Sequence, residues 1–365
     1  MKILHIAPSL LGGGVGAVIC HLANEMAKEH DVTVCSIFEP KETDLFWHRL
    51  SPQVKKETCH KKNKGVSLKV LKDIARFIRD GRYDVVHIHG FLTYYLLAIA
   101  TCPRKTKFFY TIHSDAEKEN VRWDARLLMI KKWLFRSQRV VPISVSKVSQ
   151  QSFERLYKCS CHLVYNAIPE PKLPKETNPL IASARLTPAT KVFVNPARID
   201  EPKNQVVLCK VFKRLIEEGE DVVLLIAGWK AKPYIYEAFE PLLCDRIRYI
   251  GERTDIQQLL RDSDGMCLPS IYEGLPMVLL EALAVGCTPI CSPVGGIVNV
   301  IENGVNGILS RSSDFEDYYQ TMHTFLHLNE EQTRQLKEEA RKSFDNYDIA
   351  FAAKEYCKIY KQALS

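Results

Sequence analysis

The stretch that decides the fold is Pro269–Gly286, with the sequence PSIYEGLPMVLLEALAVG. Before it, Asp264–Leu268 is a short apolar run typical of a buried strand, and after its loop the stretch becomes an apolar segment typical of a helix. Pro276 is expected at the first helical position, because its missing N–H would have no partner there. Glu273 then lies in the loop before the helix, and Glu281 lies inside the helix, roughly 7.5 Å along its axis.

Two carboxylates on either side of a helix N-terminus suit a ligand that carries both phosphate and hydroxyl groups. The free N–H groups and the positive dipole end of such a helix favour a phosphate. Glu273 and Glu281 can accept hydrogen bonds from an uncharged group beyond the phosphate and from ribose hydroxyls. The stretch therefore predicts a nucleotide-sugar site, and the simpler interpretation is a strand–turn–helix with two solvated glutamates.

The motif from Glu273 to Gly286, Glu-Gly-x-Pro-x4-Glu-Ala-x-Ala-x-Gly, resembles the Glu-x7-Glu signature of the retaining glycosyltransferases of family 4. The resemblance covers nearly the whole chain and is most specific in residues 191–310. It implies an α/β protein of the GT-B fold, in which two Rossmann-like parallel-sheet domains face each other across a cleft. It also implies transfer of a sugar from a nucleoside diphosphate to an acceptor with retention at the anomeric carbon.

The order of the elements independently predicts two α/β domains. Strands and helices alternate through residues 1–170, and the alternation restarts at residue 191 after a proline-rich linker, residues 171–190. Such repetition builds parallel, doubly wound sheets. The second domain is residues 191–347, and the resemblance implies that the C-terminal helix, residues 348–365, returns to the first. The expected strands are Lys2–Ala7, Val32–Phe38, Asp84–His87, Lys107–Ile112, Arg139–Ile143, His162–Tyr165, Lys191–Ala197, Asp221–Ala227, Arg246–Ile250, Asp264–Leu268 and Cys287–Cys291.

Composition points to a globular protein in a reducing compartment. The chain has 365 residues, of which 46% are hydrophobic and 25% charged, as in ordinary soluble proteins of two domains. It contains no run of about 18 apolar residues that could cross a bilayer. Its twelve cysteines are scattered without paired CxxC spacing, which argues against a disulfide scaffold. We therefore expect a cytoplasmic protein.

The charge is unevenly distributed along the chain. Residues 1–170 carry 27 Lys and Arg against 16 Asp and Glu, whereas residues 171–365 carry 23 against 27. A basic half can meet anionic lipid, nucleic acid or a phosphorylated acceptor, or it can be a solvated surface. With the implied activity, we expect a glycan acceptor that is lipid-linked, at the inner face of the cell membrane, in polysaccharide or lipopolysaccharide synthesis, and no nucleic acid. A soluble acceptor is the alternative.

Arg198 and Lys203 follow the first expected strand of the second domain, where ligands gather in such sheets. The family has an Arg and a Lys at this spacing, so the resemblance implies that they hold the diphosphate and stabilise charge on the leaving group. The family usually has Gly on either side of this pair, and here Ala197 and Asn204 stand instead.

The resemblance assigns roles to the motif residues themselves. Glu281 would accept hydrogen bonds from ribose, and Gly274 and Leu275 would lie beside the donor. Glu273 would contact the donor sugar and support positive charge at the anomeric carbon. Whether Glu273 bonds covalently or attack occurs from the front face stays open. Uridine diphosphate is the expected carrier, with guanosine diphosphate as the alternative.

The glycine-rich segment Leu10–Ala17 follows the first expected strand. Glycines allow close approach of the backbone to a ligand, and the resemblance implies that Gly13 and Gly14 face the donor phosphate. The same segment satisfies a dinucleotide fingerprint with Glu39 further on, so an NAD-dependent oxidoreductase is an alternative. That alternative does not account for the Arg, Lys and Glu residues of the second domain.

Several polar residues near strand ends are candidate ligands. His113 occupies the family's Thr-x-His position, which implies contact with the donor sugar. A structural role is expected for His87, and the pair it forms with His89 is poor evidence for metal. Asp262 and Asp264 resemble the DxD metal motif of another glycosyltransferase fold, but they are expected at a helix end and a strand start. We predict no metal requirement and no cofactor besides the donor.

Two further functions share the predicted fold. A nucleotide-sugar epimerase would turn over the donor with no acceptor present. A binding protein that has lost catalysis would bind nucleotide without transfer. The Gly295-Gly296 pair matches a glycine turn of the family, with Asn299 where the family commonly has a Glu.

Overall fold

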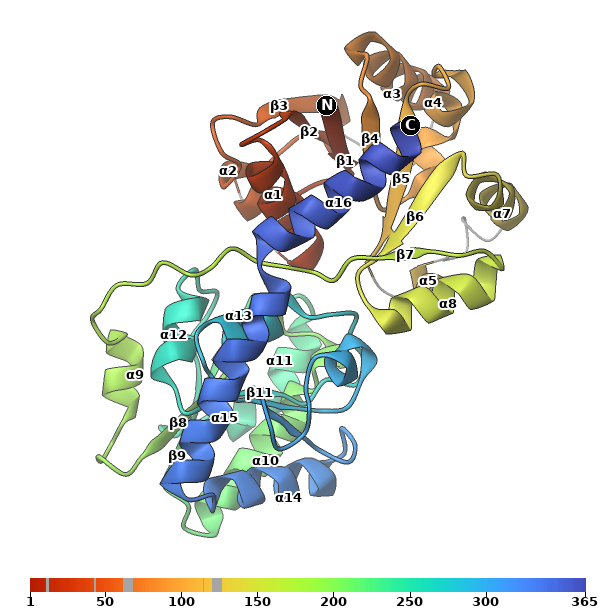
Figure 1. The fold of residues 1–365 in the computed structure, drawn as a ribbon. Helices are drawn as coiled ribbons and strands as arrows, with labels where there is room; N and C mark the ends of the chain where they lie inside the picture. The colour runs from red at the N-terminus through yellow and green to blue at the C-terminus, as the bar shows by residue number, and fades with distance from the viewer. Residues whose placement is uncertain (11–12, 43, 62–67, 114, 120–126) are drawn as a thin grey trace. The chain divides into compact units, whose positions relative to one another are not determined.

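The computed structural model describes residues 1–10, 13–42, 44–61, 68–113, 115–119 and 127–365. The chain forms two compact units. The first contains Met1–Pro169 and Tyr347–Ser365, and the second contains Glu170–Asn346. Each unit is built around one parallel sheet with helices packed on it (Figure 1).

The first unit has a seven-stranded sheet in the order β3-β2-β1-β4-β5-β6-β7, and its strand pairs are parallel. Its strands are β1 (Lys2–Ala7), β2 (Asp31–Phe38), β3 (Lys55–Lys61), β4 (Val85–His89), β5 (Lys107–Ile112), β6 (Val140–Ser144) and β7 (His162–Leu163). Its helices are α1 (Gly14–Met26), α2 (Leu45–His48), α3 (Leu68–Gly81), α4 (Leu96–Thr101), α5 (Ala116–Glu119), α7 (Leu128–Arg136), α8 (Lys147–Tyr157) and α16 (Ile349–Leu364).

The second unit has a six-stranded parallel sheet in the order β10-β9-β8-β11-β12-β13. Its strands are β8 (Lys191–Pro196), β9 (Val222–Ala227), β10 (Ile247–Tyr249), β11 (Gly265–Leu268), β12 (Pro289–Cys291) and β13 (Ile308–Leu309). Its helices are α9 (Pro179–Ala184), α10 (Gln205–Glu217), α11 (Pro233–Phe239), α12 (Ile256–Asp262), α13 (Met277–Ala284), α14 (Phe315–Leu326) and α15 (Glu330–Ser343).

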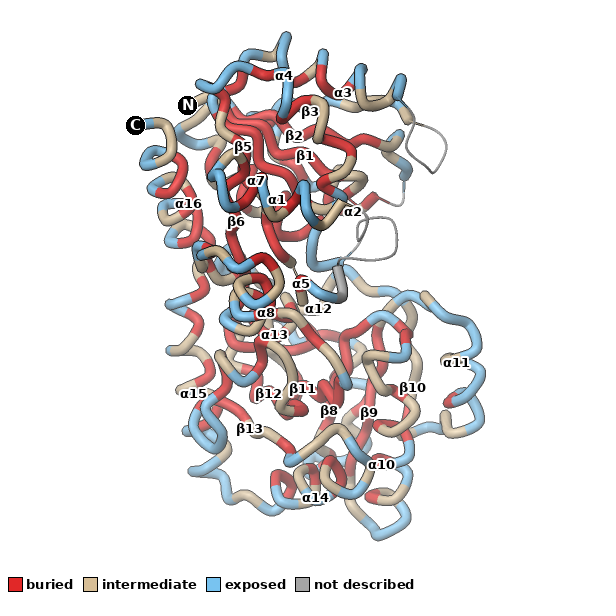
Figure 2. The backbone as a smooth tube through the Cα atoms, turned by 90° about the vertical axis from the view of Figure 1, so that its right-hand side faces the viewer, coloured by how far each residue is buried: buried red, intermediate tan, exposed pale blue. Residues whose placement is uncertain are grey.

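Burial of the strands explains why they read as continuous apolar runs. All six residues of β9, VVLLIA, are buried, and β8 and β11 are buried almost throughout. In Figure 2 the central strands of both sheets are drawn largely in red. Helices on both faces of a parallel sheet exclude water from both sides of each strand, so alternation of polar and apolar residues is absent.

Every strand expected from the sequence occurs, with its ends within two residues of those expected. Two strands were missed, β3 and the two-residue β13. The strand β3, KKETCHK, lies at the edge of its sheet, where β2 is its one partner among the described strands, so it needs few apolar residues. Its lysines, which the sequence suggested as part of a basic surface, are typical of an exposed edge strand.

The proline-rich stretch before residue 191 is ordered and lies within the second unit. It contains α9, which starts at Pro179 and is capped by Asn178, whose Oδ1 accepts a hydrogen bond of 3.0 Å from the N–H of Leu180. The N–H of Asn178 in turn donates to Asp262 at 2.7 Å. A proline at a helix start is compatible with a helix, which is why a proline count alone did not reveal α9.

The C-terminal helix α16 belongs to the first unit and contacts α1 and β5. Its Tyr360 is fully buried, packs against Phe109 with ring centroids 4.6 Å apart, and hydrogen-bonds through its hydroxyl to His87. The end of the chain therefore completes the core of its first domain.

Each sheet has one point where the strand order reverses. In the first unit β1 lies between β2 and β4, and in the second β8 lies between β9 and β11. Ligands of open α/β sheets bind at the carboxyl ends of the strands at such points. The candidate residues follow these strands: Gly13 and Gly14 come after β1, Arg198 and Lys203 after β8, and Glu273 after β11.

The twelve cysteines are free thiols. No helix in the described part of the chain combines the length and the apolarity that a bilayer-spanning segment requires.

Candidate active site

Lys203 and Glu273 form the centre of the candidate site in the second unit. The Nζ atom of Lys203 lies 2.5 Å from Oε1 of Glu273, and the two side chains are 17% and 8% exposed. Lys203 ends a short 3₁₀ helix, Glu201–Lys203, that follows β8, and Glu273 lies in the loop after the neighbouring β11. Two motifs 70 residues apart are thus joined by one ion pair. Because the pair is largely removed from water, loss of either partner would leave the other charge uncompensated.

Ser270 also holds the carboxylate of Glu273. Its buried hydroxyl donates to Oε1 at 2.7 Å, so Oε1 accepts from both Ser270 and Lys203. The second oxygen, Oε2, has no hydrogen bond to the described residues and is the atom of this carboxylate that can meet a ligand. Sequence reasoning did not single out Ser270, although a serine three positions before the glutamate was the available signal.

The glycine pair Gly295-Gly296 packs directly on the backbone of the Glu273 loop. The N–H of Gly296 donates to the carbonyl oxygen of Gly274 at 2.5 Å. A Cβ atom on Gly295 would lie 1.9 Å from the carbonyl oxygen of Glu273, and Gly295 has a φ of +56°. No larger residue fits there without displacing the loop. The glycine turn therefore sets the position of Glu273.

Asn204 explains a departure from the family pattern. Its φ of +57° lies in the left-handed region, where glycine is usual and asparagine is tolerated. Its side-chain amide donates to the carbonyl oxygens of Pro269 at 3.1 Å and Ser313 at 2.8 Å. Asn204 thus adopts a glycine-like conformation and also ties the Lys203 turn to the Glu273 loop.

Ala197, the other departure, lies against Gly228 at the ends of β8 and β9. A Cβ atom on Gly228 would lie 2.1 Å from the carbonyl oxygen of Ala197, and the φ of Gly228 is +155°. The close contact between the two backbones therefore depends on a glycine at Gly228, in the turn that faces Ala197, and not on a glycine at position 197.

Arg198 is held in place by protein contacts, but its guanidinium is still accessible to a ligand. Its side chain is 51% exposed and its Nη2 lies 3.0 Å from Oδ2 of Asp200. Its carbonyl oxygen accepts from the side chain of Gln205 at 2.9 Å, which fixes the backbone of the turn. A half-exposed ion pair contributes about 0–1 kcal/mol, so a diphosphate can compete for the guanidinium.

Helix α13 begins one residue later than the sequence predicted. Pro276 has a φ of −70° and a ψ of 127°, so it is the N-cap and Met277 is the first helical residue. The fixed φ of proline suits either position, and the extended ψ decides between them. Within the described residues no side chain caps this helix, and the N–H of Leu279 donates to the carbonyl oxygen of Pro276 at 3.1 Å. The N–H groups that precede Leu279 in the first turn are therefore the ones that can meet a ligand. Glu281 is the fifth residue of the helix and is partly buried.

Asp262 and Asp264 have the structural roles expected of them. Asp262 ends α12 and accepts from the N–H of Asn178, as described above. Asp264 precedes β11, accepts from the N–H of Val192 at 2.7 Å and pairs with Arg185 at 2.9 Å. Both carboxylates hold backbone groups.

In the first unit, the glycine turn begins α1. Gly13 is the N-cap with a φ of +125°, a conformation that favours glycine, and a Cβ atom there would have no neighbour among the described residues within 4 Å. Gly14 is the first helical residue. Residues 11–12 of this turn lie outside the described residues. The backbone at Gly13 is thus open to a ligand.

His113 follows β5 at the carboxyl edge of the first sheet and is partly buried. Burial lowers its pKa from 6.5 to about 4, so the imidazole is neutral at pH 7. Its Nε2 atom lies 3.1 Å from Nδ1 of His89.

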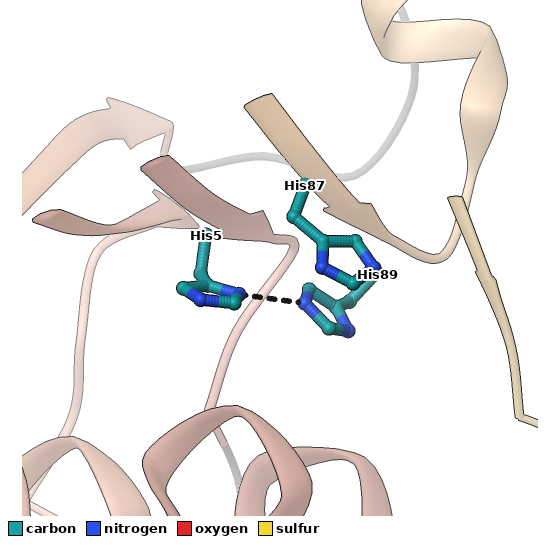
Figure 3. A group of neighbouring side chains, drawn as sticks. All are labelled: His5, His87 and His89. Carbon is teal, nitrogen blue, oxygen red and sulfur yellow. Dashed lines mark hydrogen bonds between the residues drawn. The ribbon is translucent and has the colours of Figure 1, made fainter. Parts of the chain in front are cut away.

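Three more histidines lie side by side in this sheet. His5 on β1 is the register partner of His87 on β4, and His89 follows on the same face (Figure 3). One nitrogen from each of these three rings lies within 4.8 Å of those from the other two, as a metal site would require. Both nitrogens of His87 are already hydrogen-bonded, to Thr111 at 2.6 Å and to the hydroxyl of Tyr360. His87 is therefore held in the core by protein groups, in agreement with its expected structural role.

Comparison with known proteins follows the same division of the chain. Residues 12–170 match the family model Glycosyltransferase Family 4, and residues 179–343 match the model Glycosyl transferases group 1. The chain belongs to the family 4 glycosyltransferases. A glycosyltransferase from Rickettsia africae superimposes with a TM-score of 0.82 at 19% identity, covering 100% of this chain and 98% of that one. Anabaena HepE in complex with UDP superimposes with a TM-score of 0.81 at 17% identity, covering 99% and 100%. The glycosyltransferase thus has the GT-B fold.

Two of its bacterial relatives are named for reactions on sugars linked to diphosphoundecaprenol. It is 25% identical over 268 residues to the UDP-Gal:alpha-D-GlcNAc-diphosphoundecaprenol alpha-1,3-galactosyltransferase of Escherichia coli, covering 69% of this chain and 68% of that enzyme. It is 30% identical over 141 residues to the N,N'-diacetylbacillosaminyl-diphospho-undecaprenol alpha-1,3-N-acetylgalactosaminyltransferase of Campylobacter jejuni. That second match spans 39% of this chain and 37% of the Campylobacter enzyme.

Proposed function

We propose that this glycosyltransferase moves a sugar from a UDP-sugar to a lipid-linked glycan with retention at the anomeric carbon, at the cytoplasmic face of the membrane. The ion pair between Lys203 and Glu273 carries the proposal. It joins a cation suited to a diphosphate and a carboxylate suited to a sugar at the switch point of one sheet.

The diphosphate would be held by groups that bear positive charge. Arg198 offers its exposed guanidinium, Lys203 its ammonium, and α13 its uncapped first turn with Gly274 and Leu275 just before it. From the first domain, Gly13 and Gly14, both exposed at the start of α1, would face the phosphates. The same cations would stabilise the charge that grows on the departing diphosphate, so no metal ion is needed for that purpose.

Glu273 would act on the sugar itself. Its Oε2 would accept from a sugar hydroxyl or lie near the anomeric carbon, where positive charge develops as the bond to the diphosphate breaks. Glu281 would accept from the ribose hydroxyls, and neutral His113 would hydrogen-bond the donor sugar. Retention follows if the acceptor attacks from the face that the diphosphate leaves, or if Glu273 forms a covalent intermediate.

The nature of donor and acceptor draws support from the relatives. The Escherichia coli enzyme is named for a UDP-galactose donor and a diphosphoundecaprenol-linked acceptor, and HepE binds UDP in its crystal. An acceptor of this chemistry combines a lipid, a diphosphate and a sugar. The excess of basic residues in residues 1–170 suits such an anionic substrate.

A thermal-shift panel with UDP, GDP and NAD tests the donor site. We expect UDP to stabilise the protein, since a ligand at about 100 times its Kd adds roughly 2.7 kcal/mol to the free energy of unfolding. Arg198→Ala should lose most of this shift, whereas Arg334→Ala, on the exposed face of α15, should keep it. Stabilisation by NAD alone would instead favour the oxidoreductase, and donor turnover without acceptor would favour an epimerase.

Membrane association has a candidate element in α7 of the first unit. Met129, Ile130 and Trp133 lie on one face of this helix and are 75%, 45% and 63% exposed. The basic residues Lys132 and Arg136 flank them. An apolar stripe with tryptophan and adjacent cations is typical of a helix that lies in the interface of an anionic bilayer.

Vesicle sedimentation at low salt tests this element. We expect wild-type protein to bind vesicles rich in phosphatidylglycerol, and the double variant Met129→Ser/Trp133→Ser to lose most of this binding. Phe351→Ser, which removes a similarly exposed single aromatic on α16, is the matched control and should bind as wild type does. Equal binding by all three proteins would exclude α7 as the docking element.

A further inference from the structure

A row of hydrogen-bonded imidazoles runs from the interior of the first sheet to His113. The Nδ1 atom of His5 lies 3.1 Å from Nε2 of His89, the contact that Figure 3 marks with a dashed line. The Nδ1 atom of His89 lies 3.1 Å from Nε2 of His113. The row thus crosses three neighbouring strands, β1, β4 and the end of β5.

Each imidazole in the row is neutral at pH 7 and carries one N–H. Burial lowers the pKa of His5 to about 4 and that of His89 well below 6.5, and His113 behaves like His5. A neutral imidazole has one donor nitrogen and one acceptor nitrogen. The proton position on one ring therefore determines that on the next.

Only two arrangements satisfy both contacts. In the first, every ring is protonated at Nδ1, so His5 donates to His89, His89 donates to His113, and His113 presents Nδ1–H at the end of the row. In the second, every ring is protonated at Nε2, the donations run in reverse, and His113 presents a bare Nδ1. Any mixed arrangement brings two N–H groups or two lone pairs together.

The buried end of the row selects between the two arrangements. Nε2 of His5 is buried without a hydrogen-bond partner in the described part of the chain. In the second arrangement it would carry a buried N–H with no acceptor, which is rare in proteins and costly. In the first arrangement it carries only a lone pair.

We propose that His5 and His89 are positioning residues that hold His113 in the Nδ1–H form, so that it can only donate a hydrogen bond through the nitrogen at the end of the row. The inference rests on the proposed function, since it gives His113 a defined task there. The Nδ1–H group of His113 would donate a hydrogen bond to a hydroxyl oxygen of the transferred sugar. It would disfavour a ligand group that can only donate a hydrogen bond, because His113 offers no lone pair there. His89, on β4, lies one strand away from His113, and His5, on β1, lies two strands away.

The proton positions can be measured on the whole protein without any substrate. Two-bond ¹⁵N–¹H correlation spectra of histidine-labelled protein at pH 7.5 distinguish the two neutral forms of each ring. We expect His5, His89 and His113 all to be protonated at Nδ1. Wild-type spectra in which His113 is protonated at Nε2 would overturn the proposal, whatever the enzyme proves to transfer.

Variants then test the coupling. His5→Phe keeps an aromatic ring but removes the donor to His89, so His113 should shift toward a mixture of forms. We also expect kcat for transfer to fall about tenfold, the effect of one hydrogen bond to the reacting sugar, with the donor KM changed less than twofold. His87→Phe is the matched control, because His87 has the same size, burial and sheet face but stands outside the row.

The outcomes separate the proposal from simpler explanations. If His87→Phe changes the His113 spectrum as much as His5→Phe does, the row has no special role and the effect is one of packing. If added Zn²⁺ perturbs His5, His87 and His89 together, the cluster is a metal site and the proposal is wrong. If wild-type protein shows the expected Nδ1–H forms but transfers no sugar, the proposed function fails while the proton positions stand.

Discussion

Replacement of Glu273 by glutamine is expected to lower the transfer rate by on the order of 10³-fold while the protein stays folded. Glutamine has the same shape, and its side-chain oxygen can still accept from Ser270 and Lys203, which lie 2.7 Å and 2.5 Å from Oε1. What disappears is the negative charge that the proposed function places near the anomeric carbon. The loss should therefore appear in kcat, with the UDP affinity changed little. Steady-state kinetics and UDP titration on the same preparation measure both quantities.

Two further substitutions define what the Glu273 result means. Glu281→Gln should weaken UDP binding, because its proposed partners are the ribose hydroxyls, and should affect kcat less. Glu302→Gln changes an exposed glutamate of the same unit and should leave both quantities unaltered. Near-wild-type turnover by Glu273→Gln would remove this carboxylate from the chemistry and leave it a structural partner of Lys203.

The sequence contained most of the fold because the strands of both sheets are buried on two faces. Such strands stand out as short apolar runs between turns, as β9 does. The elements that were missed lack this signal. The edge strand β3 consists mostly of charged and polar residues, and α9 lies in a stretch whose prolines are typical of a linker.

The residues of the candidate site that belong to a single motif could be predicted from the sequence. The contacts between residues of different motifs could not. The motif residues Arg198, Lys203 and Glu273 could be named from spacing and resemblance. The ion pair between Lys203 and Glu273 could not, because it depends on β8 and β11 being neighbours. Ser270 was missed for the same reason, since its role exists only once the loop is folded around Glu273.

Asn204 shows how a conformation can replace a residue type. By residue type, Asn204 departs from the glycine of the family pattern and weakens the match. By backbone conformation, Asn204 has the left-handed φ of +57° that explains why glycine is common at this position. The side-chain bonds to Pro269 and Ser313 are an addition that glycine could not make.

Gly295→Ala is expected to inactivate the enzyme without changing any group that touches substrate. The new Cβ would lie 1.9 Å from the carbonyl oxygen of Glu273, so the loop must move away from the glycine turn. That movement displaces the carboxylate of Glu273 from its place beside Lys203, and a shift of about 1 Å in a catalytic group can cost on the order of 10²-fold in rate. We also expect about 3 kcal/mol of destabilisation, from the collision and from the φ of +56°. Chemical denaturation and kinetics measure the two effects.

Gly304→Ala separates the collision from the backbone strain. Gly304 also has a positive φ, +79°, but a Cβ atom there would meet nothing within 4 Å. It should therefore lose only about 1 kcal/mol of stability, the cost of the left-handed conformation alone, and retain its activity. If Gly295→Ala behaved like Gly304→Ala, the loop would be free to adjust, and the glycine turn would not be what sets the position of Glu273. A large loss at Gly295 alone would mean that the position of the Glu273 carboxylate, which we propose to be catalytic, is set by a backbone contact outside the motif that carries it.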